Sequence, residues 1–335
     1  MPQLTFAPAR FDVLAIGNAI VDVLAHADDA FLAAEDLPKG AMTLIDTARA
    51  EDLYGKMGPG VEMSGGSAAN TIAGLASLGG RGAFVGKVAN DQLGRVFGHD
   101  IKALGIEFET APLVGGAPTA RCLILVTPDA QRTMNTFLGA CTELGPDDIV
   151  EAQVAEAKIT YLEGYLWDPP RAKEAFLKAA SAAHAAGRLV ALSLSDPFCV
   201  DRHRASFLEL LEGHVDILCA NEEEILSLYQ VDDLAEATKR VRDHCQIAAV
   251  TRGADGCIVV AGEEVHLLDA VAPARLADTT GAGDAFAAGF LHGLTAGHDL
   301  KTAGRIGAIA ASEIIAHMGA RADRPLKAVV ADHLG

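Results

Sequence analysis

The sequence predicts an α/β fold with a mainly parallel central sheet and a small β-sheet lid. Along most of the chain, short apolar stretches alternate with helical ones, which is typical of strands joined by right-handed crossovers. The alternation stops between residues 106 and 138, where strand-like segments follow one another. A length of 335 residues, 50% of them hydrophobic, suits one large domain with a smaller companion.

The N-terminal third begins with strands and continues with alternating helices and strands. Apolar stretches predict strands at 13–17 (VLAIG), 21–27 (VDVLAHA) and 41–46 (AMTLID). Residues 65–80 (GGSAANTIAGLASLGG) start with two glycines and then repeat apolar residues on one helical face. We expect a strand at 82–88 and a helix at 91–105 to follow.

The middle of the chain predicts successive strands, and regular alternation then resumes. The successive strands are expected at 108–114, 119–127 and 132–139. The later strands are expected at 159–165, 188–195, 215–221, 247–253 and 257–262, with alanine-rich helices between most of them. We therefore assign residues 1–17, 65–106 and 138–335 to a large α/β body, and 18–64 and 107–137 to a β lid. Gly65 and Gly66 would be the hinge.

The charge and cysteine content exclude several classes of protein. Forty-five acidic and 27 basic residues give a net charge of −18, which is unsuited to nucleic acid or anionic membranes. Six widely spaced cysteines without a Cys-x-x-Cys pair indicate reduced thiols in a cytoplasmic protein. The N-terminus does not resemble a signal peptide, and no apolar run approaches membrane-spanning length.

The stretch DTTGAGDAFAAGF (278–290) predicts an anion site at the start of a helix. Gly281 and Gly283 leave the backbone open to an approaching group, and Asp284 follows directly. Free N–H groups and the helix dipole favour an anion at such an end. Taken alone, the stretch is better explained by a glycine loop with a first-turn acid. The helix is indicated by apolar residues at four-residue steps: Phe286, Phe290 and Leu294.

Other polar groups lie at the ends of predicted strands. Asn221 and Glu224 would face one side of a first helical turn, where they could hold Mg²⁺ through water or form a solvated helix start. TRGADG (251–256) would contact nucleotide phosphates or form a plain turn. In α/β folds, ligands bind at the carboxyl ends of strands.

The motifs GGSAAN (65–70) and DTTGAGDAF (278–286) resemble the two signatures of the ribokinase/PfkB carbohydrate kinase family, in matching order. Within that family, GNAIVD (17–22), YLEGYL (161–166), SLSDPF (193–198) and VDILCANEEE (215–224) are similar to adenosine kinases. The resemblance implies a ribokinase-like three-layer α/β/α body that binds the nucleotide, with a β lid over the acceptor site. It also implies ATP as phosphoryl donor, with Mg²⁺.

The resemblance also implies roles for individual residues. Asp284 would be the catalytic base, Arg132 would reach the phosphate from the lid, and the anion hole would consist of Gly281, Ala282 and Gly283. The sugar would be held by Asn18, Asp22, Gly65, Gly66 and Asn70. Apolar contacts to the base would come from Leu138, Leu166 and Phe198. The nucleotide site would include Asn221, Thr251, Gly253, Gly256, Gly281 and Gly283.

Two cation sites are implied as well. Mg²⁺ would be organised through water by Asn221 and Glu224, and a monovalent cation such as K⁺ would lie near Asp278, Thr280 and Gly319. Met42 stands where adenosine kinases often carry glutamine, and Leu166 stands where an aromatic residue commonly stacks on the base.

The expected reaction is ATP-dependent phosphorylation of a nucleoside 5′-hydroxyl, with adenosine converted to AMP, a step of purine salvage. A sugar kinase of the same family, another purine nucleoside kinase and a non-catalytic binding protein are the alternatives. The expected partners are ATP and a small nucleoside or sugar, without nucleic acid or membrane. The expected assembly is a monomer or homodimer.

Overall fold

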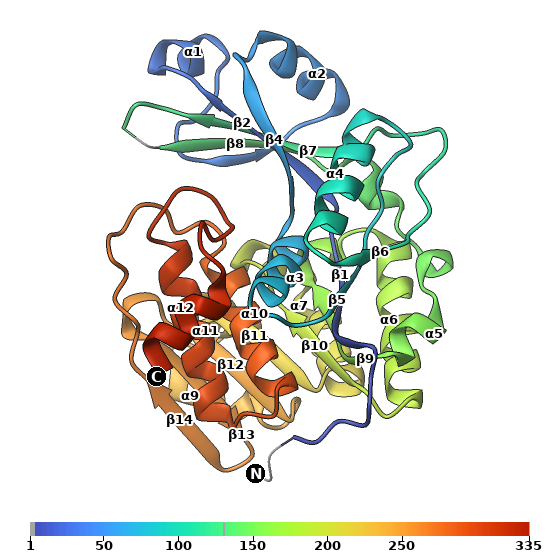
Figure 1. Cartoon of the computed structure of the whole chain (residues 1–335), viewed down its shortest axis with the longest axis vertical. Coiled ribbons are helices and arrows are strands. Elements are labelled where there is room, and N and C mark those ends of the chain that lie inside the picture. The colour runs from blue at the N-terminus through green and yellow to red at the C-terminus, as the bar shows by residue number, and fades with distance from the viewer. Residues whose placement is uncertain (1–3, 130, 335) are drawn as a thin grey trace.

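The computed structural model describes residues 4–129 and 131–334, and it contains two sheets (Figure 1). A nine-stranded sheet lies at the centre of a large body, and a five-stranded sheet lies above it. This is the predicted architecture. The ends of the predicted body at 1–3 and 335, and residue 130 of the predicted lid, lie outside the described residues. No helix in the described ranges is long and apolar enough to cross a membrane.

The large sheet is parallel over seven of its strands. At one edge, β13 is antiparallel to both of its neighbours, β12 and β14. The order across the sheet is β14 (Glu264–Leu268), β13 (Cys257–Ala261), β12 (Ile247–Thr251), β11 (Ile217–Asn221), β10 (Leu189–Ser193), β9 (Ala157–Glu163), β1 (Phe11–Ile16), β5 (Gly82–Val85) and β6 (Glu107–Phe108).

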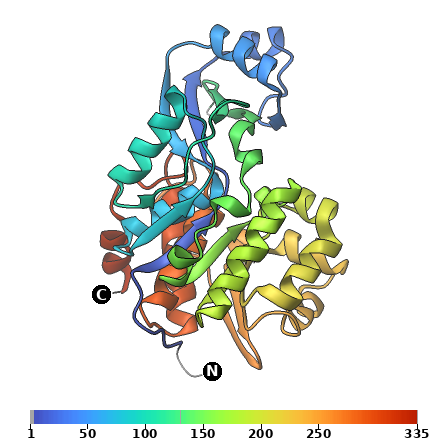
Figure 2. The ribbon, with the colours of Figure 1, turned by 90° about the vertical axis from the view of Figure 1, so that its right-hand side faces the viewer.

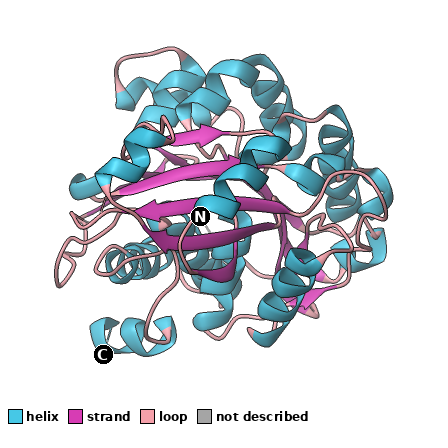
Figure 3. Cartoon of the chain, turned by 90° about the horizontal axis from the view of Figure 1, so that it is seen from above, coloured by secondary structure: helices cyan, strands magenta, loops and turns pink. Residues whose placement is uncertain are grey.

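Helices cover both faces of this sheet, as Figures 2 and 3 show. The side chains of β1 alternate between the two cores: Leu14 and Ile16 pack into one, and Val13 and Ala15 into the other. The first core includes α5 (Glu151–Ala155), α6 (Pro170–Ala185), α7 (Pro197–His214), α8 (Glu222–Tyr229) and α9 (Leu234–Val241). The second includes α3 (Ser67–Ser77), α4 (Gln92–Ala103), α10 (Ala282–Thr295) and α11 (Leu300–Ile314), and α12 (Leu326–Leu334) packs on α11 and α3.

The small sheet has one face covered by helices and one facing a cavity. Along β2, Val21 and Val23 are buried in the core that contains Leu53 of α2, whereas Ile20, Asp22 and Leu24 line the cavity. This period-two pattern is what a strand between a core and a cavity requires. The order is β3 (Met42–Leu44), β8 (Arg132–Phe137), β7 (Ala120–Val126), β2 (Ile20–His26) and β4 (Gly60–Gly65), with α1 (Asp29–Ala34) and α2 (Thr47–Lys56) outside.

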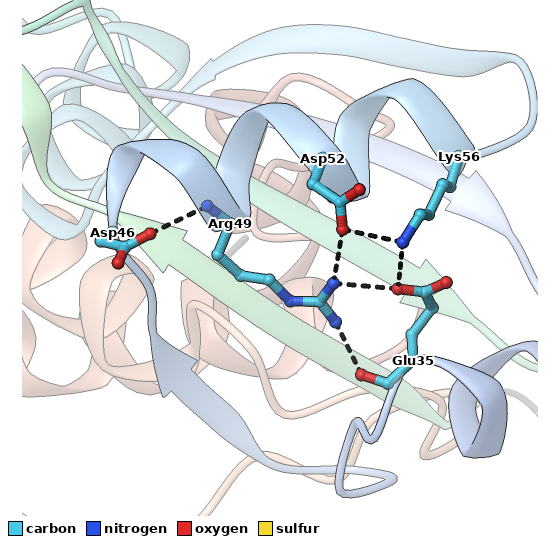
Figure 4. Close-up of polar contacts among 5 residues, drawn as sticks. All are labelled: Glu35, Asp46, Arg49, Asp52 and Lys56. Atoms are coloured by element: carbon cyan, nitrogen blue, oxygen red, sulfur yellow. Dashed lines mark hydrogen bonds and ion pairs between the residues drawn. The ribbon is translucent and has the colours of Figure 1, made fainter.

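Ion pairs connect α2 to the end of α1 on the outside of the small sheet (Figure 4). Arg49 and Lys56 both contact the Glu35 carboxylate, at 2.9 and 3.1 Å, and both contact Asp52. Arg49 also donates to the Glu35 carbonyl at 2.6 Å, and Asp46 caps the start of α2. A network of this kind holds the two helices together more effectively than isolated surface pairs would.

Some elements differ from the sequence-based expectation. The strand expected at 108–114 is only Glu107–Phe108, and it pairs with β5 in the large sheet rather than joining the small one. The reason is packing, because the Phe108 ring lies 5.9 Å from Phe84 and 5.4 Å from Phe97 in the body core. Strands β4 and β14 and the two outer helices α1 and α2 were not predicted.

Short 3₁₀ turns complete the chain at η1 (Gly139–Glu143), η2 (Pro146–Asp148), η3 (Gly164–Trp167) and η4 (Gly253–Asp255). All six cysteines are buried and free, as expected for reduced thiols. Burial raises the pKa of Cys245 to about 12 and that of Cys257 to about 11, so these thiols are poor nucleophiles at neutral pH.

Candidate active site

A cavity of about 920 Å³ lies between the inner face of the small sheet and the carboxyl ends of the large sheet. Parallel strands bring their following residues to one edge, which is where α/β folds place ligands. The residues contributed from the ends of β9, β10, β11 and β12 include Glu163, Ser193, Asn221 and Thr251. The cavity therefore has a polar floor made by the body and a wall made by the small sheet.

The start of α10 supplies backbone N–H groups at this floor. Gly281 is the N-cap residue with φ of +77°, a conformation that favours glycine, and its backbone packs against Ala320. The Ala282 N–H bonds to the Thr279 carbonyl at 3.2 Å. Among the described residues, the N–H groups of Gly281 and Gly283 have no acceptor, so they are available to an anion at the positive end of the helix.

Asp284 lies in the first turn of α10 and faces the first turn of α3. Its carboxylate accepts hydrogen bonds from Ser67 Oγ at 2.6 Å and Asn70 Nδ2 at 3.3 Å. Burial raises the pKa of Asp284 to about 6, and the two donors act in the opposite direction. The carboxylate is therefore mostly ionised at neutral pH, yet basic enough to accept a proton. Ser67 was not among the predicted site residues.

Asp22 lines the cavity from β2, opposite the start of α10. Burial raises its pKa to about 6, while Arg321 and Arg132 oppose that shift. Gly65 lies behind this carboxylate and does not line the cavity: a Cβ there would be 2.3 Å from Asp22 Oδ2. The glycine identity at 65 thus makes room for Asp22.

Glu163, which was not predicted as a site residue, organises the end of β1 and the start of α3. Its carboxylate accepts from Asn18 Nδ2 at 2.6 Å, from the Asn18 N–H at 3.3 Å and from the Ala68 N–H at 2.7 Å. Burial raises its pKa to about 7. The sequence signal was an acidic residue at the end of an otherwise apolar strand.

Arg132 of β8 connects the small sheet to the loop before α10. Its Nη1 lies 2.5 Å from Asp278 Oδ2, and both side chains are less than 10% exposed. Asp278 also accepts from the N–H groups of Thr280 at 2.9 Å and Gly319 at 3.1 Å. These donors stabilise the Asp278 carboxylate, and the monovalent cation site near Asp278, Thr280 and Gly319 stays a prediction.

Asn221 and Glu224 form a capping box at the start of α8. Asn221 Nδ2 donates to Glu224 Oε1 at 2.7 Å, and the Glu224 N–H donates to Asn221 Oδ1 at 2.8 Å. Glu224 is 5% exposed and lines the cavity. Burial raises its pKa to about 7, and the charges of Asp196 and Glu223 add to that effect. A cation nearby would relieve this repulsion.

Not every residue expected at the nucleotide site lines the cavity. Thr251 does, but Gly253 and Gly256 lie in the turn between β12 and β13. Gly256 has φ of +83°, and a Cβ there would be 1.9 Å from the Leu268 carbonyl oxygen. The turn therefore requires glycine at 256, and the φ of +56° at Gly253 favours glycine there too; contact of either residue with a nucleotide stays a prediction.

The wall opposite the polar floor is mostly apolar, apart from Asp22, Arg132 and Thr136. Phe198, at the start of α7, is 76% exposed and lines the cavity across from the small sheet. Leu138 lines it as well. From the inner face of the small sheet come Ile20, Leu24, Met42, Leu44, Met63, Ile124 and Met134. Such a wall fits a flat apolar group rather than a fully hydroxylated one.

The expectation for Leu166 is corrected by the structure. Leu166 is 1% exposed and belongs to the body core, whereas the neighbouring Tyr165 lines the cavity and is 36% exposed. Both lie in η3, where consecutive side chains point about 120° apart. The Tyr165 N–H donates to Ser195 Oγ at 3.0 Å, which connects this turn to the segment that carries Phe198.

The remaining predicted residues converge on the cavity. It is lined by Asn18, Asp22, Gly66, Asn70, Arg132, Asn221, Glu224, Gly281, Gly283, Asp284 and Gly319, with Ala282 in the first turn of α10. Residues 41–327 also match the family model described as pfkB family carbohydrate kinase. The chain belongs to the PfkB family of carbohydrate kinases.

Individual members resemble this PfkB-family kinase closely. The adenosine kinase of Sinorhizobium meliloti is 52% identical, with a TM-score of 0.89 over 97% of this chain and 100% of that one. A probable sugar kinase of Rhizobium etli is 51% identical, with a TM-score of 0.90 over 97% and 99%. A 5-dehydro-2-deoxygluconokinase of Geobacillus thermodenitrificans is 30% identical over 75% of this chain and 78% of its own length. The PfkB-family kinase therefore has relatives named for both nucleoside and sugar acceptors.

Proposed function

We propose that this PfkB-family kinase transfers a phosphoryl group from ATP to the 5′-hydroxyl of adenosine, forming AMP. The apolar cavity wall carries this proposal. A purine base offers two flat faces for Phe198 and for side chains such as Met134, whereas a bare sugar gives them little to bury. The name of the Sinorhizobium meliloti relative, at 52% identity, supports the same acceptor.

In the proposed reaction the acceptor oxygen attacks the γ-phosphorus of ATP. The bond from that phosphorus to the ADP oxygen breaks, and Asp284 takes the hydroxyl proton. The N–H groups of Gly281 and Gly283, which have no acceptor among the described residues, would stabilise the charge that develops on the transferring group. Arg132 would exchange its Asp278 partner for the phosphate. Removal of water by the small sheet would protect ATP from hydrolysis.

The acceptor would be oriented by polar groups at the floor of the cavity. Asp22 would accept hydrogen bonds from the ribose hydroxyls, and Asn18 and Asn70 would complete the contacts. Glu163 would act indirectly, because its carboxylate is already occupied by Asn18 and the Ala68 N–H. The two ends of the acceptor would thus meet different chemistry, with a polar sugar site and an apolar base site.

Asn221 and Glu224 would hold Mg²⁺ through water. Their oxygen donors and the repulsion around Glu224 fit a divalent cation. No cluster of three or more His, Cys, Asp or Glu side chains suited to a metal is found among the described residues, so water would supply most ligands. The bound ion would neutralise phosphate charge.

Glu224→Gln should raise the Mg²⁺ concentration required for half-maximal rate, because the amide keeps the shape of the side chain but lacks its charge. The measurement is a Mg²⁺ titration of the initial rate, with Glu236→Gln as control since Glu236 lies in α9 outside the cavity. An unchanged Mg²⁺ requirement would show that Glu224 only caps the start of α8.

A sugar kinase is the second candidate. The 30% identical 5-dehydro-2-deoxygluconokinase and the probable sugar kinase favour it, as does the cluster of hydroxyl-binding groups around Asp22. The two candidates differ in what the apolar wall does. Only the nucleoside candidate needs it for acceptor affinity.

Phe198→Ala is expected to weaken adenosine phosphorylation by up to about 1.5 kcal/mol in transition-state binding, roughly tenfold in kcat/KM, from lost aromatic contact. Any ribose phosphorylation should be nearly unchanged. The measurement is kcat/KM for both acceptors, with Leu267→Ala as control, since Leu267 is 73% exposed and does not line the cavity. If wild type prefers ribose, or if both acceptors suffer equally, the sugar kinase candidate is correct.

A further inference from the structure

Three consecutive residues between α11 and α12 contact three different parts of the site. The Gly319 N–H donates to Asp278 at 3.1 Å. Ala320 packs so closely on the anion-hole residue Gly281 that a Cβ added to Gly281 would be 2.6 Å from the Ala320 Cβ. Arg321 extends to the opposite side, toward β4 and α4. This segment therefore bridges the phosphate end and the acceptor end of the cavity.

Arg321 fixes the end of β4. Its Nη2 donates to Ser64 Oγ at 2.7 Å, and its Nη1 donates to Asp100 Oδ2 at 3.2 Å. Asp100, on α4, also accepts from the Ser64 N–H at 2.8 Å. Ser64 is 1% exposed and immediately precedes the glycine pair. A shift of Ser64 would therefore displace the start of α3, which holds the Asp284 carboxylate.

Arg321 also carries charge toward Asp22. The groups that act on the Asp22 carboxylate are Arg321, Arg132 of β8 and Asp284 of α10, and Asp22 in turn acts on the Cys122 thiol of β7. Arg321 is the strongest of the positive groups that oppose the effect of burial on the pKa of Asp22. Both arginines also have another carboxylate partner: Arg132 pairs with Asp278 at 2.5 Å, and Arg321 pairs with Asp100 at the longer distance of 3.2 Å.

We propose that Arg321 is a positioning residue that couples the acceptor-binding carboxylate Asp22 to the anion hole, by fixing the end of β4 and by facing Asp22 with positive charge. This inference rests on the proposed role of Asp22, but not on adenosine as the acceptor. A purely structural ion pair would contribute only to folding stability.

The test uses Arg321→Gln and Arg321→Lys in the full-length protein, with Arg324→Gln as matched control. Arg324 lies in the same segment, but its side chain is 58% exposed and pairs with Asp332. Whichever acceptor the wild type phosphorylates is used, so a sugar preference would contradict the proposed function without affecting this test. Arg321→Gln should lower kcat/KM for the acceptor by on the order of 10²-fold, with the KM for ATP nearly unchanged.

The pH profile separates positioning from stability. Loss of the charge should raise the pKa of Asp22, so the fall of acceptor kcat/KM on acidification should begin at higher pH in Arg321→Gln. Arg321→Lys should return this fall in activity at low pH, the acid limb of the profile, to its wild-type position. It should restore only part of the rate, since an ammonium cannot reproduce both contacts of the guanidinium. Asp100→Asn should lower the rate without moving the limb, and it carries the test if Arg321→Gln does not fold.

The proposal is overturned if Arg321→Gln lowers the melting temperature but leaves the acid limb and the acceptor kcat/KM at wild-type values. It is also overturned if kcat/KM for the acceptor and kcat/KM for ATP fall equally and the pH at which activity falls does not change. That pattern indicates general loss of folded enzyme.

Discussion

Asp284→Asn is expected to reduce phosphoryl transfer by about 10²- to 10⁴-fold, because asparagine keeps the shape of the side chain but cannot take the acceptor proton. Folding and ATP binding should remain largely intact, since Ser67 and Asn70 still find an oxygen at this position. The measurement is single-turnover phosphorylation by the purified variant, with ATP affinity and the melting temperature measured in parallel.

The control is Asp299→Asn, which alters a comparable acid at the start of α11, outside the cavity. The wild-type pH profile gives an independent measurement. Because the pKa values of Asp284 and Asp22 are both about 6, kcat/KM should fall as either carboxylate is protonated below that pH. Near-normal turnover by Asp284→Asn would remove this carboxylate from the role of base.

Asp22→Ala is expected to weaken every acceptor. A buried pair of hydroxyls loses its charged partner, which costs about 1.5–3 kcal/mol, or roughly 10- to 150-fold in kcat/KM. The loss should appear in kcat/KM for the acceptor rather than in the KM for ATP, because Asp22 comes from the small sheet. The measurement is kcat/KM for adenosine and ribose in parallel.

Asp22→Asn is the matched variant, since it keeps the volume and part of the hydrogen bonding. It should lie between wild type and Asp22→Ala. Equal activity of Asp22→Ala and wild type toward the preferred acceptor would show that the sugar is held elsewhere in the cavity.

The strands and the site at their ends were predictable because both depend on local patterns. Buried parallel strands give continuous apolar runs, and the residues that follow them converge at one edge of the sheet. Asn221 and Thr251 were located in this way, as was Asp284 from its glycine-rich helix start. The match of residues 41–327 to the PfkB family confirmed the resemblance carried by the two motifs.

The parts that escaped prediction depend on long-range contacts. Tyr165 and Leu166 are adjacent, and only the turn of η3 decides which one faces the cavity. Arg321 is 257 residues away from its partner Ser64, so no local pattern connects the two. The short strand β6 joined the large sheet because of an aromatic contact between Phe108 and Phe84. Side-chain direction in a short 3₁₀ turn and contacts between distant residues are not encoded in periodicity.

The close approach of Gly65 to Asp22 has a consequence for how the chain can vary. Since a Cβ at position 65 would lie 2.3 Å from the Asp22 carboxylate, only glycine fits there while Asp22 keeps its place. Any larger residue at position 65 would push the Asp22 carboxylate out of its present position. Residues 65 and 22 are therefore expected to change together in evolution. A homologue with a larger residue at 65 would need a different way to hold its acceptor.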